Sequence, residues 1–438
     1  MPPAVPPVGP GFPPLDEALG LLPGHLTPWL AESLVQLGTR LPFGQAAEVL
    51  WHFTQTSVSE ATARRLTERA AAAWLQLDLA EVARGEGDLA EADAAPAPDL
   101  LQVSVDGAMV GLVGGEWGEV KLAAIGVVVR DAAGTVTTTE LSYVARLTDA
   151  ERFTQHALPE LRRRGVDRAA TVVGVADGAS WIQGFLDWHC PDAVRILDFP
   201  HAVGYLAQAA QETWGPGTAA TSEWLAVQAQ TLKHGDPEDV LLALAALPPG
   251  PARDAALGYL GTRRAQITYA AFQAAGYPIG SGCVESGNKV VIEARLKGPG
   301  MHWTRDHADA LAALRTVIAN GRWADAWPRI AGQLRHAAHQ PSARRRLARQ
   351  PPRAGPTRPT TAAQPTAGIR CPGPGTPEDH RQRQTHRRPS VETIRPLSRR
   401  TETLTGTPYA VPHCWAPRAR GRAGTRRPRA ARGSAARR

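Results

Sequence analysis

The stretch Leu100–Val110, LLQVSVDGAMV, constrains the fold of this chain more than any other segment. Apolar and polar residues alternate from Leu101 to Asp106, which is the two-residue period of a β-strand with one buried face. Asp106 lies on the polar face, and we expect the chain to leave the strand at Gly107, which directly follows it. A carboxylate fixed at the end of a rigid strand is well placed for metal chemistry. The alternative is an Asp-Gly pair that only opens a turn, which is a common use of these residues.

The charge of the chain is unevenly distributed. Residues 331–438 contain 24 arginines, no lysine and 4 acidic residues, so their net charge is +20, although the whole chain carries only +8. Residues 1–330 therefore carry −12. Because the body of the chain is acidic, binding to nucleic acid must depend on local basic clusters there and not on the overall charge.

Composition excludes several classes of protein. No run approaches the roughly 18 apolar residues that span a membrane, and the proline-rich leader 1–14 is unlike a secretory signal. The four cysteines lie far apart without a CxxC pair. This spacing argues against a zinc ribbon or a disulfide scaffold and fits a reducing cytoplasm.

Residues 15–84 have a helical, acidic pattern. One helix is predicted at Pro42–Phe53, and a second begins after the N-cap Ser59. Such a pair is typical of a helix-turn-helix whose second helix enters a DNA major groove, although ordinary helical bundles contain similar pairs. In the DNA-binding interpretation the contacting residues are Thr62, Arg64 and Arg65. The small, acidic residues of 85–99 predict a linker.

Residues 100–330 predict an α/β domain. Strands are expected at 100–110, 119–130 and 136–144, then a helix from Thr148 to Arg164, a buried strand at 170–176, a helix at 179–189 and a strand at 193–197. This order, with acidic residues ending the first and fourth strands, is that of a ribonuclease-H-like domain. Residues 202–275 predict a helical insertion, and a last helix ends near Gly321. Residues 331–438 lack apolar periodicity and predict a disordered, basic, low-complexity tail.

Three carboxylates form the candidate catalytic constellation: Asp106, Asp177 after the fourth strand, and Glu285 in the first turn of a helix. Together they can hold two Mg²⁺ or Mn²⁺ ions, which activate a water or a DNA 3′-hydroxyl and stabilise the leaving oxygen of a phosphoryl displacement. Hard oxygen ligands favour these ions over zinc. Glu293 lies on the same helix two turns further on and is the weaker alternative to Glu285.

A basic cluster adjoins Glu285 in the otherwise acidic body. Lys289, Arg295 and Lys297 are expected to contact DNA phosphates, the alternative being a solvated helix face. Trp303 is a candidate for stacking on an unpaired base, although tryptophan more often belongs to a core.

The motifs of this chain resemble those of DDE transposases of bacterial insertion sequences, most closely the ISKra type. The resemblance covers roughly residues 12–330. It rests on four motifs: VDGA at 105–108, DGASWI at 177–182, LDFPHA at 197–202 and YPIGSGCVESGNK at 277–289, which continues into RLKG and GMHW.

The resemblance implies roles for several residues and partners. The matching carboxylates, Asp106, Asp177 and Glu285, would bind the metal ions. Asp198 and His201 match the Asp-x-x-His motif shared with Mutator-like transposases, which makes them accessory active-site residues. The implied partners are double-stranded DNA, as element ends and target, and further copies of the chain on that DNA. The implied location is the cytoplasm, at the nucleoid, without a membrane.

The chain departs from this family at both ends. Relatives carry a cysteine-paired, zinc-finger-like segment before the position of Pro13, and they end soon after the basic helix at about 330–349. The arginine- and proline-rich extension is compatible with translation in a shifted frame. Three hypotheses follow: an active transposase, a truncated remnant that only binds DNA, and a ribonuclease-H-like nuclease of repair or resolution, which the long helical insertion disfavours.

Overall fold

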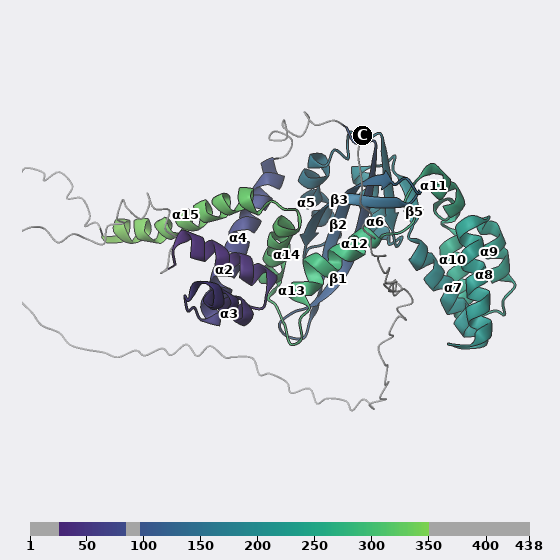
Figure 1. Ribbon diagram of the computed structural model, residues 1–438, viewed down its shortest axis with the longest axis horizontal. Helices are drawn as coiled ribbons and strands as arrows, with labels where there is room; N and C mark the ends of the chain where they lie inside the picture. The colour runs from purple at the N-terminus through teal and green to yellow at the C-terminus, as the bar shows by residue number, and fades with distance from the viewer. Residues whose placement is uncertain (1–25, 85–96, 350–438) are drawn as a thin grey trace, which may run out of the picture. The chain divides into compact units, whose positions relative to one another are not determined.

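The structure is a computed structural model that describes residues 26–84 and 97–349, with side chains up to residue 337. All of them belong to one compact unit (Figure 1). Its helices and strands are, in chain order, α2 (Pro28–Arg40), α3 (Phe43–Thr54), α4 (Glu60–Arg84), β1 (Leu100–Gly111), β2 (Trp117–Arg130), β3 (Val136–Arg146), α5 (Ala150–Arg163), β4 (Thr171–Ala176), α6 (Ser180–His189), β5 (Val194–Leu197), α7 (Phe199–Trp214), α8 (Ala219–His234), α9 (Pro237–Ala245), α10 (Pro251–Gly261), the 3₁₀ turn η3 (Arg264–Gln266), α11 (Tyr269–Ala275), α12 (Gly282–Gly287), the π-helix η4 (Asn288–Glu293), α13 (Ala294–Leu296), α14 (Arg305–Ala319) and α15 (Trp323–Arg349).

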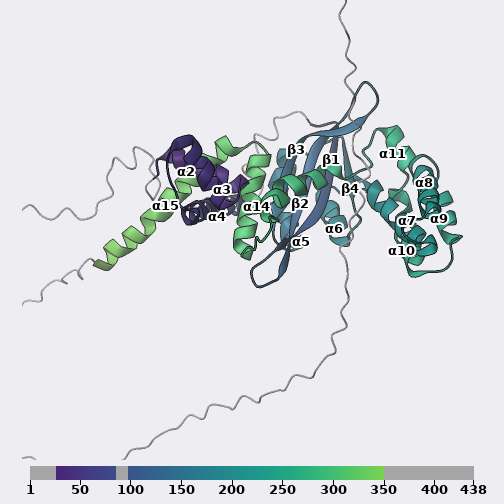
Figure 2. The same cartoon turned by 60° about the horizontal axis from the view of Figure 1, so that its bottom comes forward.

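The sheet has five strands in the order β3-β2-β1-β4-β5 (Figure 2). β1, β2 and β3 pair antiparallel, whereas β4 pairs parallel with both β1 and β5. The prediction of an α/β fold with three antiparallel strands followed by two alternating strand–helix units is confirmed. This mixed sheet is compatible with a ribonuclease-H-like domain.

Both faces of the sheet are covered. Leu101, Val103 and Val105 of β1 pack with α5 and α6 on one face, and Ala108 and Val110 pack with α12, η4 and α14 on the other. The prediction of a strand with one solvated face was wrong, because the polar residues preceding Asp106 are also buried: Gln102 and Ser104 are each 1 % exposed.

Helices α7–α11 share one core with strands β4 and β5 at the β5 side of the sheet. Leu206, Leu232 and Leu260 meet Leu197 of β5 in this core. The hydroxyl of Tyr269 donates a hydrogen bond to the backbone oxygen of Leu197, at 2.8 Å. The helical segment predicted as an insertion, called the insertion below, begins with α7 at Phe199, three residues before the predicted position.

The two helices predicted before the linker are present as α3 and α4, and Ser59 accepts a hydrogen bond from the Thr62 amide at 3.2 Å, as an N-cap does. These helices do not have a separate core. Ala70 and Ala71 of α4 pack with Leu314 of α14 and Ile330 of α15. Residues 1–25 and 85–96, which hold the leader and most of the linker, lie outside the described residues.

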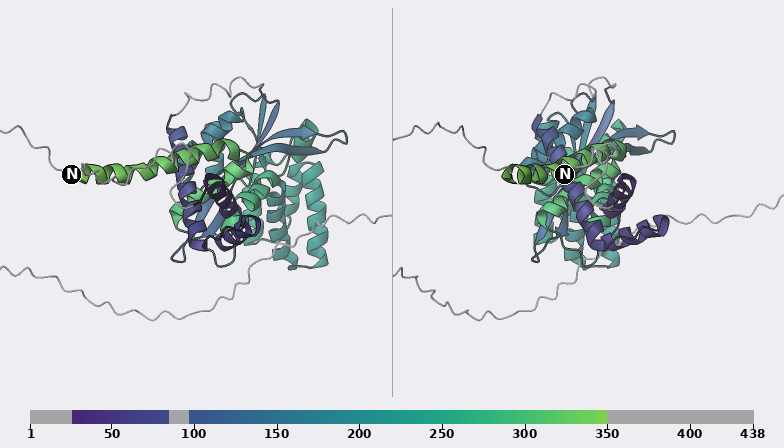
Figure 3. Two further views of the ribbon diagram at one scale, coloured as in Figure 1. Left: turned by 60° about the vertical axis from the view of Figure 1, so that its left-hand side comes forward. Right: turned by 90° about the vertical axis from the view of Figure 1, so that its left-hand side faces the viewer.

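Helix α15 corrects the predicted start of the tail. It runs through residues 331–349 as one continuous helix (Figure 3), where a disordered segment was expected. Ala331 and Leu334 are buried against α4, next to Trp74. Their apolar contacts were hidden within an arginine-rich composition. Residues 350–438, the rest of the predicted tail, lie outside the described residues.

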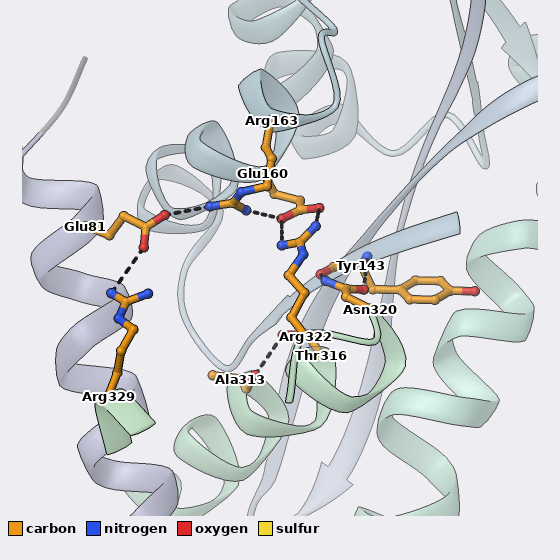
Figure 4. A network of polar contacts seen from close by, with 9 residues as sticks. All are labelled: Glu81, Tyr143, Glu160, Arg163, Ala313, Thr316, Asn320, Arg322 and Arg329. Carbon is orange, nitrogen blue, oxygen red and sulfur yellow. Dashed lines mark hydrogen bonds and ion pairs between the residues drawn. The ribbon is translucent and has the colours of Figure 1, made fainter. Parts of the chain in front are cut away.

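A network of ion pairs joins α4, α5 and the start of α15 (Figure 4). Arg322 donates two hydrogen bonds of 2.5 Å to Glu160, which also pairs with Arg163. Glu81 of α4 accepts from Arg163 at 2.6 Å and lies 3.6 Å from Arg329. Burial alone would raise the pKa of Glu160, but the hydrogen bond and charge of Arg322, with the charge of Arg163, hold it below its ordinary value.

Among the helices within 26–84 and 97–349, none combines the length and the apolar character that crossing a membrane requires.

Candidate active site

Asp106 lies within β1 and not at its end. The strand continues to Gly111 because it remains paired with β2, and Gly107 stands opposite Lys121. The prediction that the chain leaves the strand at Gly107 was wrong, and the turn alternative is excluded with it. A Cβ at this glycine would meet Oε1 of Glu119 at 2.2 Å, so the missing side chain gives room to that carboxylate.

Asp177 directly follows β4, as the sequence predicts. β4 pairs parallel with β1. Leu100 lies opposite Thr171, and the next three residues of each strand pair in the same register. The pairing ends at Val103 and Gly174, so each aspartate follows the last paired residue of its strand by three positions. Both aspartates thus stand equally far beyond the paired segment, and the predicted convergence of their carboxylates stays a prediction.

The insertion holds the turn after Asp177. The Tyr259 hydroxyl of α10 donates a hydrogen bond to the Asp177 backbone oxygen, and Arg263 Nη2 donates to the Gly178 oxygen at 2.9 Å. Asp177 Oδ1 accepts from the Ala179 amide at 2.9 Å. Gly178 has φ +81°, a left-handed conformation that glycine adopts without strain. The turn is therefore fixed both locally and from the insertion.

Helix α12 places Glu285 over the polar side of β1. Gln102 Nε2 donates to the Gly280 oxygen at 3.0 Å, just before this helix begins. Asn288 Nδ2 donates to Asp106 Oδ2 at 2.6 Å, just after it ends. Two side chains of β1, four residues apart, thus hold both ends of α12, and the Glu285 side chain remains exposed.

The three carboxylates interact electrostatically. Burial raises the pKa of Asp106 above its ordinary value, and the charges of Asp177 and Glu285 raise it further. Hydrogen bonds from the Gly107 amide and from Asn288 act in the opposite direction. A concentration of negative charge at Asp106 is the property that a divalent cation would neutralise.

The helix that carries Glu285 changes its pitch. Helical spacing predicts Glu285, Lys289, Ile292 and Leu296 on about one face, but the first two are exposed and the last two are fully buried. The reason is the π-helix Asn288–Glu293, whose wider turns rotate the following residues toward the core.

Asn288 is a site residue that the sequence interpretation missed. It is 7 % exposed, and its Oδ1 is a buried oxygen without a hydrogen-bond partner. The sequence offered one indication of this role: Asn288 follows Glu285 by three residues, a spacing at which helical residues share a face. Its contact with Asp106, 182 positions away in the sequence, required the tertiary structure.

The donor atoms suit Mg²⁺ or Mn²⁺. Asp106, the two carboxylates whose charges act on it, and the unpartnered amide oxygen of Asn288 are the hard oxygen ligands that these ions prefer. As the side chains stand, no three His, Cys, Asp or Glu residues within the described ranges are arranged as a ready metal site. The chemistry of the residues therefore fits the ions, and the predicted carboxylate separation of about 4–8 Å stays a prediction.

Asp198 lies buried beside the site, whereas His201 is exposed. Asp198 Oδ1 accepts from the Ser281 amide at 2.7 Å, and its Oδ2 accepts from the His201 amide at 2.9 Å. The carboxylate thus caps α7 and fixes the turn that leads into α12. The His201 ring packs at 5.5 Å from Tyr205 and 5.9 Å from Tyr259.

Several candidate DNA contacts are accessible. Arg64 and Arg65 are exposed in the first turns of α4, and Thr62 bonds to Ser59 at 3.0 Å. Lys289 is exposed four residues after Glu285, and Lys297 pairs with Glu293 at 2.9 Å. Their predicted role in binding DNA stays a prediction.

Arg295 and Trp303 are not on the surface, which corrects their expected contacts with DNA. Arg295 is 1 % exposed, donates to the Gly38 oxygen at 3.0 Å and lies over the rings of Phe43 and Trp303. Trp303 is 7 % exposed and donates to the Leu296 oxygen at 3.1 Å. Both are core residues, because α2 and α3 cover the segment that the local sequence presents as a basic loop.

Comparison with known proteins assigns no family: no protein-family model matches the chain, and no curated protein matches it.

Proposed function

We propose that this chain is a DDE transposase of a bacterial insertion sequence, of the ISKra type that its motifs resemble, with a ribonuclease-H-like catalytic domain. The observation that supports the proposal is the parallel pairing of β1 and β4, which ends three residues before both Asp106 and Asp177, together with the influence of Asp177 and Glu285 on the pKa of Asp106. Carboxylates from two neighbouring strands and one helix are an arrangement that can hold the two metal ions of phosphoryl transfer.

Each carboxylate has its own support. Asp106 is held by Asn288 and by the Gly107 amide, Asp177 by its turn and by the insertion, and Glu285 by the anchored helix α12. These three residues would bind two Mg²⁺ or Mn²⁺ ions, which would supply an activated oxygen nucleophile and stabilise the leaving oxygen. The protein would fix the positions of these ions through the three carboxylates.

The partners proposed are the DNA ends of the element and a target duplex, bound by more than one copy of the chain at the nucleoid. Thr62, Arg64 and Arg65 would contact the ends, and Lys289 and Lys297 would contact phosphates near the carboxylates. Phosphate contacts of this kind are salt-dependent and are largely independent of the metal ions.

The first prediction separates cleavage from binding. Asp106→Asn keeps the size of the side chain but removes a metal-binding charge, so cleavage of a labelled element end in Mg²⁺ is expected to fall by several orders of magnitude. Binding of the same duplex, measured by a mobility shift, should hardly change. Arg65→Ala should weaken binding and reduce the salt slope by about one.

Asp187→Asn is the matched control, because Asp187 is an exposed carboxylate of α6 that pairs with Arg195 at 2.9 Å. It should cut as the wild type does. A wild-type protein that binds the ends but cuts nothing in Mg²⁺ or Mn²⁺ would show a DNA-binding remnant. Normal cutting by Asp106→Asn would refute the assignment of the metal site.

A further inference from the structure

Asn288 contacts Asp106 from the far end of the helix that carries Glu285. Its Nδ2 lies 2.6 Å from Asp106 Oδ2, while the Gly107 amide donates to the other carboxylate oxygen at 2.7 Å. Both oxygens of Asp106 therefore have a fixed donor. A carboxylate held at both oxygens keeps one orientation, which is what binding a cation from a rigid scaffold needs.

The other half of the Asn288 amide has no partner. Its Oδ1 is buried and accepts no hydrogen bond. Leaving a buried acceptor unsatisfied is costly, and such atoms in proteins usually have a bound water or ion. The amide cannot turn over to relieve this, because its oxygen would then face the negatively charged Asp106.

The helix around Asn288 is held from the opposite side. Arg315 of α14 donates hydrogen bonds to the backbone oxygens of Val290 and Val291, within the π-helix that Asn288 begins. A third bond, from Nη1 to the Thr39 oxygen, is 2.7 Å long. The position of Asn288 is thus set by the fold and not by its contact with Asp106 alone.

We propose that Asn288 is a positioning residue for Asp106 and that its Oδ1 accepts a hydrogen bond from the hydration shell of a divalent cation held by the carboxylates. This inference rests on the proposed function, because it assumes a cation at Asp106. It assigns to one amide two tasks: the nitrogen orients a ligand, and the oxygen receives the hydrated ion.

The test measures Mn²⁺ binding to the whole protein by electron paramagnetic resonance, without DNA. Asn288→Leu has similar volume but neither donor nor acceptor, and it should weaken Mn²⁺ binding by roughly ten- to a hundredfold, as losses of ligand-orienting contacts do. Asn288→Asp restores an oxygen and adds a charge. It should bind Mn²⁺ at least as tightly as the wild type, while its melting temperature without metal falls because two carboxylates then face each other.

Asn320→Leu is the matched control. Asn320 bonds to the backbone of Tyr143 through both ends of its amide, at 2.8 and 3.0 Å. Its loss should lower the melting temperature without changing Mn²⁺ affinity. Circular dichroism would show that each variant folds, and Asn288→Ser, which is too short to reach Asp106, replaces the leucine variant if that one aggregates and should show the same weakening.

Three results would overturn the proposal: wild-type protein without Mn²⁺ binding, an Asn288→Leu variant with wild-type affinity, or an Asn288→Asp variant weakened as much as Asn288→Leu. The proposed function has a separate readout. If the variants show the expected pattern of Mn²⁺ affinities but the wild type cuts no DNA, the result would support the role of Asn288 and refute the proposed transposase activity.

Discussion

At the scale of single residues, Asp198 joins elements that are distant in the chain. Its two oxygens accept hydrogen bonds from the backbone of α7 and from Ser281, before α12. The Phe199 amide adds a bond to the Ile279 oxygen at 2.9 Å. The start of the helix that carries Glu285 is therefore fixed to the end of β5, and Asp198 acts on the site through this turn.

Asp198→Asn is expected to lower the free energy of unfolding by about 1–3 kcal/mol, since an amide has one acceptor oxygen for two backbone donors. Cleavage should fall as well, because the turn before α12 is released. Urea unfolding measures the first effect and end cleavage the second. Asp192→Asn, at an exposed position before β5, is the control; equal stability of the two variants would contradict the role given to Asp198.

At the scale of elements, the π-helix Asn288–Glu293 decides which residues reach the site. It keeps Asn288 facing Asp106 while the following residues turn into the core as Val291 and Ile292. A π-turn leaves backbone oxygens poorly placed for their own helix, and the buried guanidinium of Arg315 satisfies two of them. Burial lowers the pKa of Arg315 to about 10, with a smaller contribution from the charge of Arg40, and the group remains cationic at neutral pH.

Arg315→Met should destabilise the protein by roughly 2–4 kcal/mol, because two buried carbonyl oxygens and a partly buried one lose their donor while the apolar volume is kept. Weaker Mn²⁺ binding should accompany the loss. Thermal or urea unfolding gives the stability. Arg305→Met, at an exposed position in the first turn of α14, is the control and should hardly change the stability. If Arg315→Met also left the stability unchanged, the π-helix would not depend on Arg315.

The sequence predicted those elements whose periodicity is local. The alternation in β1 and the apolar run of β4 predicted both strands and the place of Asp177 directly after β4, whereas Asp106, expected at the end of its strand, lies within β1. The strand register was not predictable, since it depends on pairing between segments 71 residues apart. Nor was the π-helix, because a change of pitch leaves no mark in a short segment with ordinary helix-compatible residues.

Burial by distant segments explains the errors at the basic loop. Arg295 and Trp303 stand among Lys, Gly and His, a composition typical of exposed loops. The residues that cover them, Gly38 and Phe43, precede them by more than 250 positions. In the same way, contacts with α4 bury Leu334, although the sequence around it contains few apolar residues.

At the scale of the whole described unit, charged groups tie α4 to the sheet. Arg146 of β3 is almost fully buried, forms two hydrogen bonds with Asp309 at 2.9 and 3.0 Å, and also reaches Asp78 of α4 at 3.2 Å. Burial raises the pKa of Asp78 to about 6, and the charges of Glu81 and Asp309 add to the rise, against the lowering effect of Arg146.

A raised pKa in the folded state means that the fold favours the protonated form of Asp78. The contribution of this group to stability is therefore best near pH 4, declines as the pH rises to about 6, and is constant above. Asp78→Asn should remove this decline, so the stability of the variant relative to wild type should increase between pH 4 and 6. Urea unfolding of both proteins across this range measures it.

Glu151→Gln, at an exposed position in the first turn of α5, controls for a general loss of negative charge. Its stability difference from wild type should vary little over the same pH range. A difference for Asp78→Asn that stays flat with pH would show that Asp78 is charged throughout and is fully compensated by Arg146.

The shared register of β1 and β4 also determines how this site can decay. Side chains alternate with a period of two, so inserting or deleting one residue before Asp106 would turn that carboxylate to the opposite face and send valines to the polar one. The same change would place the polar side chains of β1 against α5 and α6, and the domain would fail to fold. Purifying selection on folding alone therefore preserves the spatial relation of the two aspartates. In a lineage that no longer needs the chemistry, point substitution of the carboxylates, and not a shift of the strands, is the open route to inactivity.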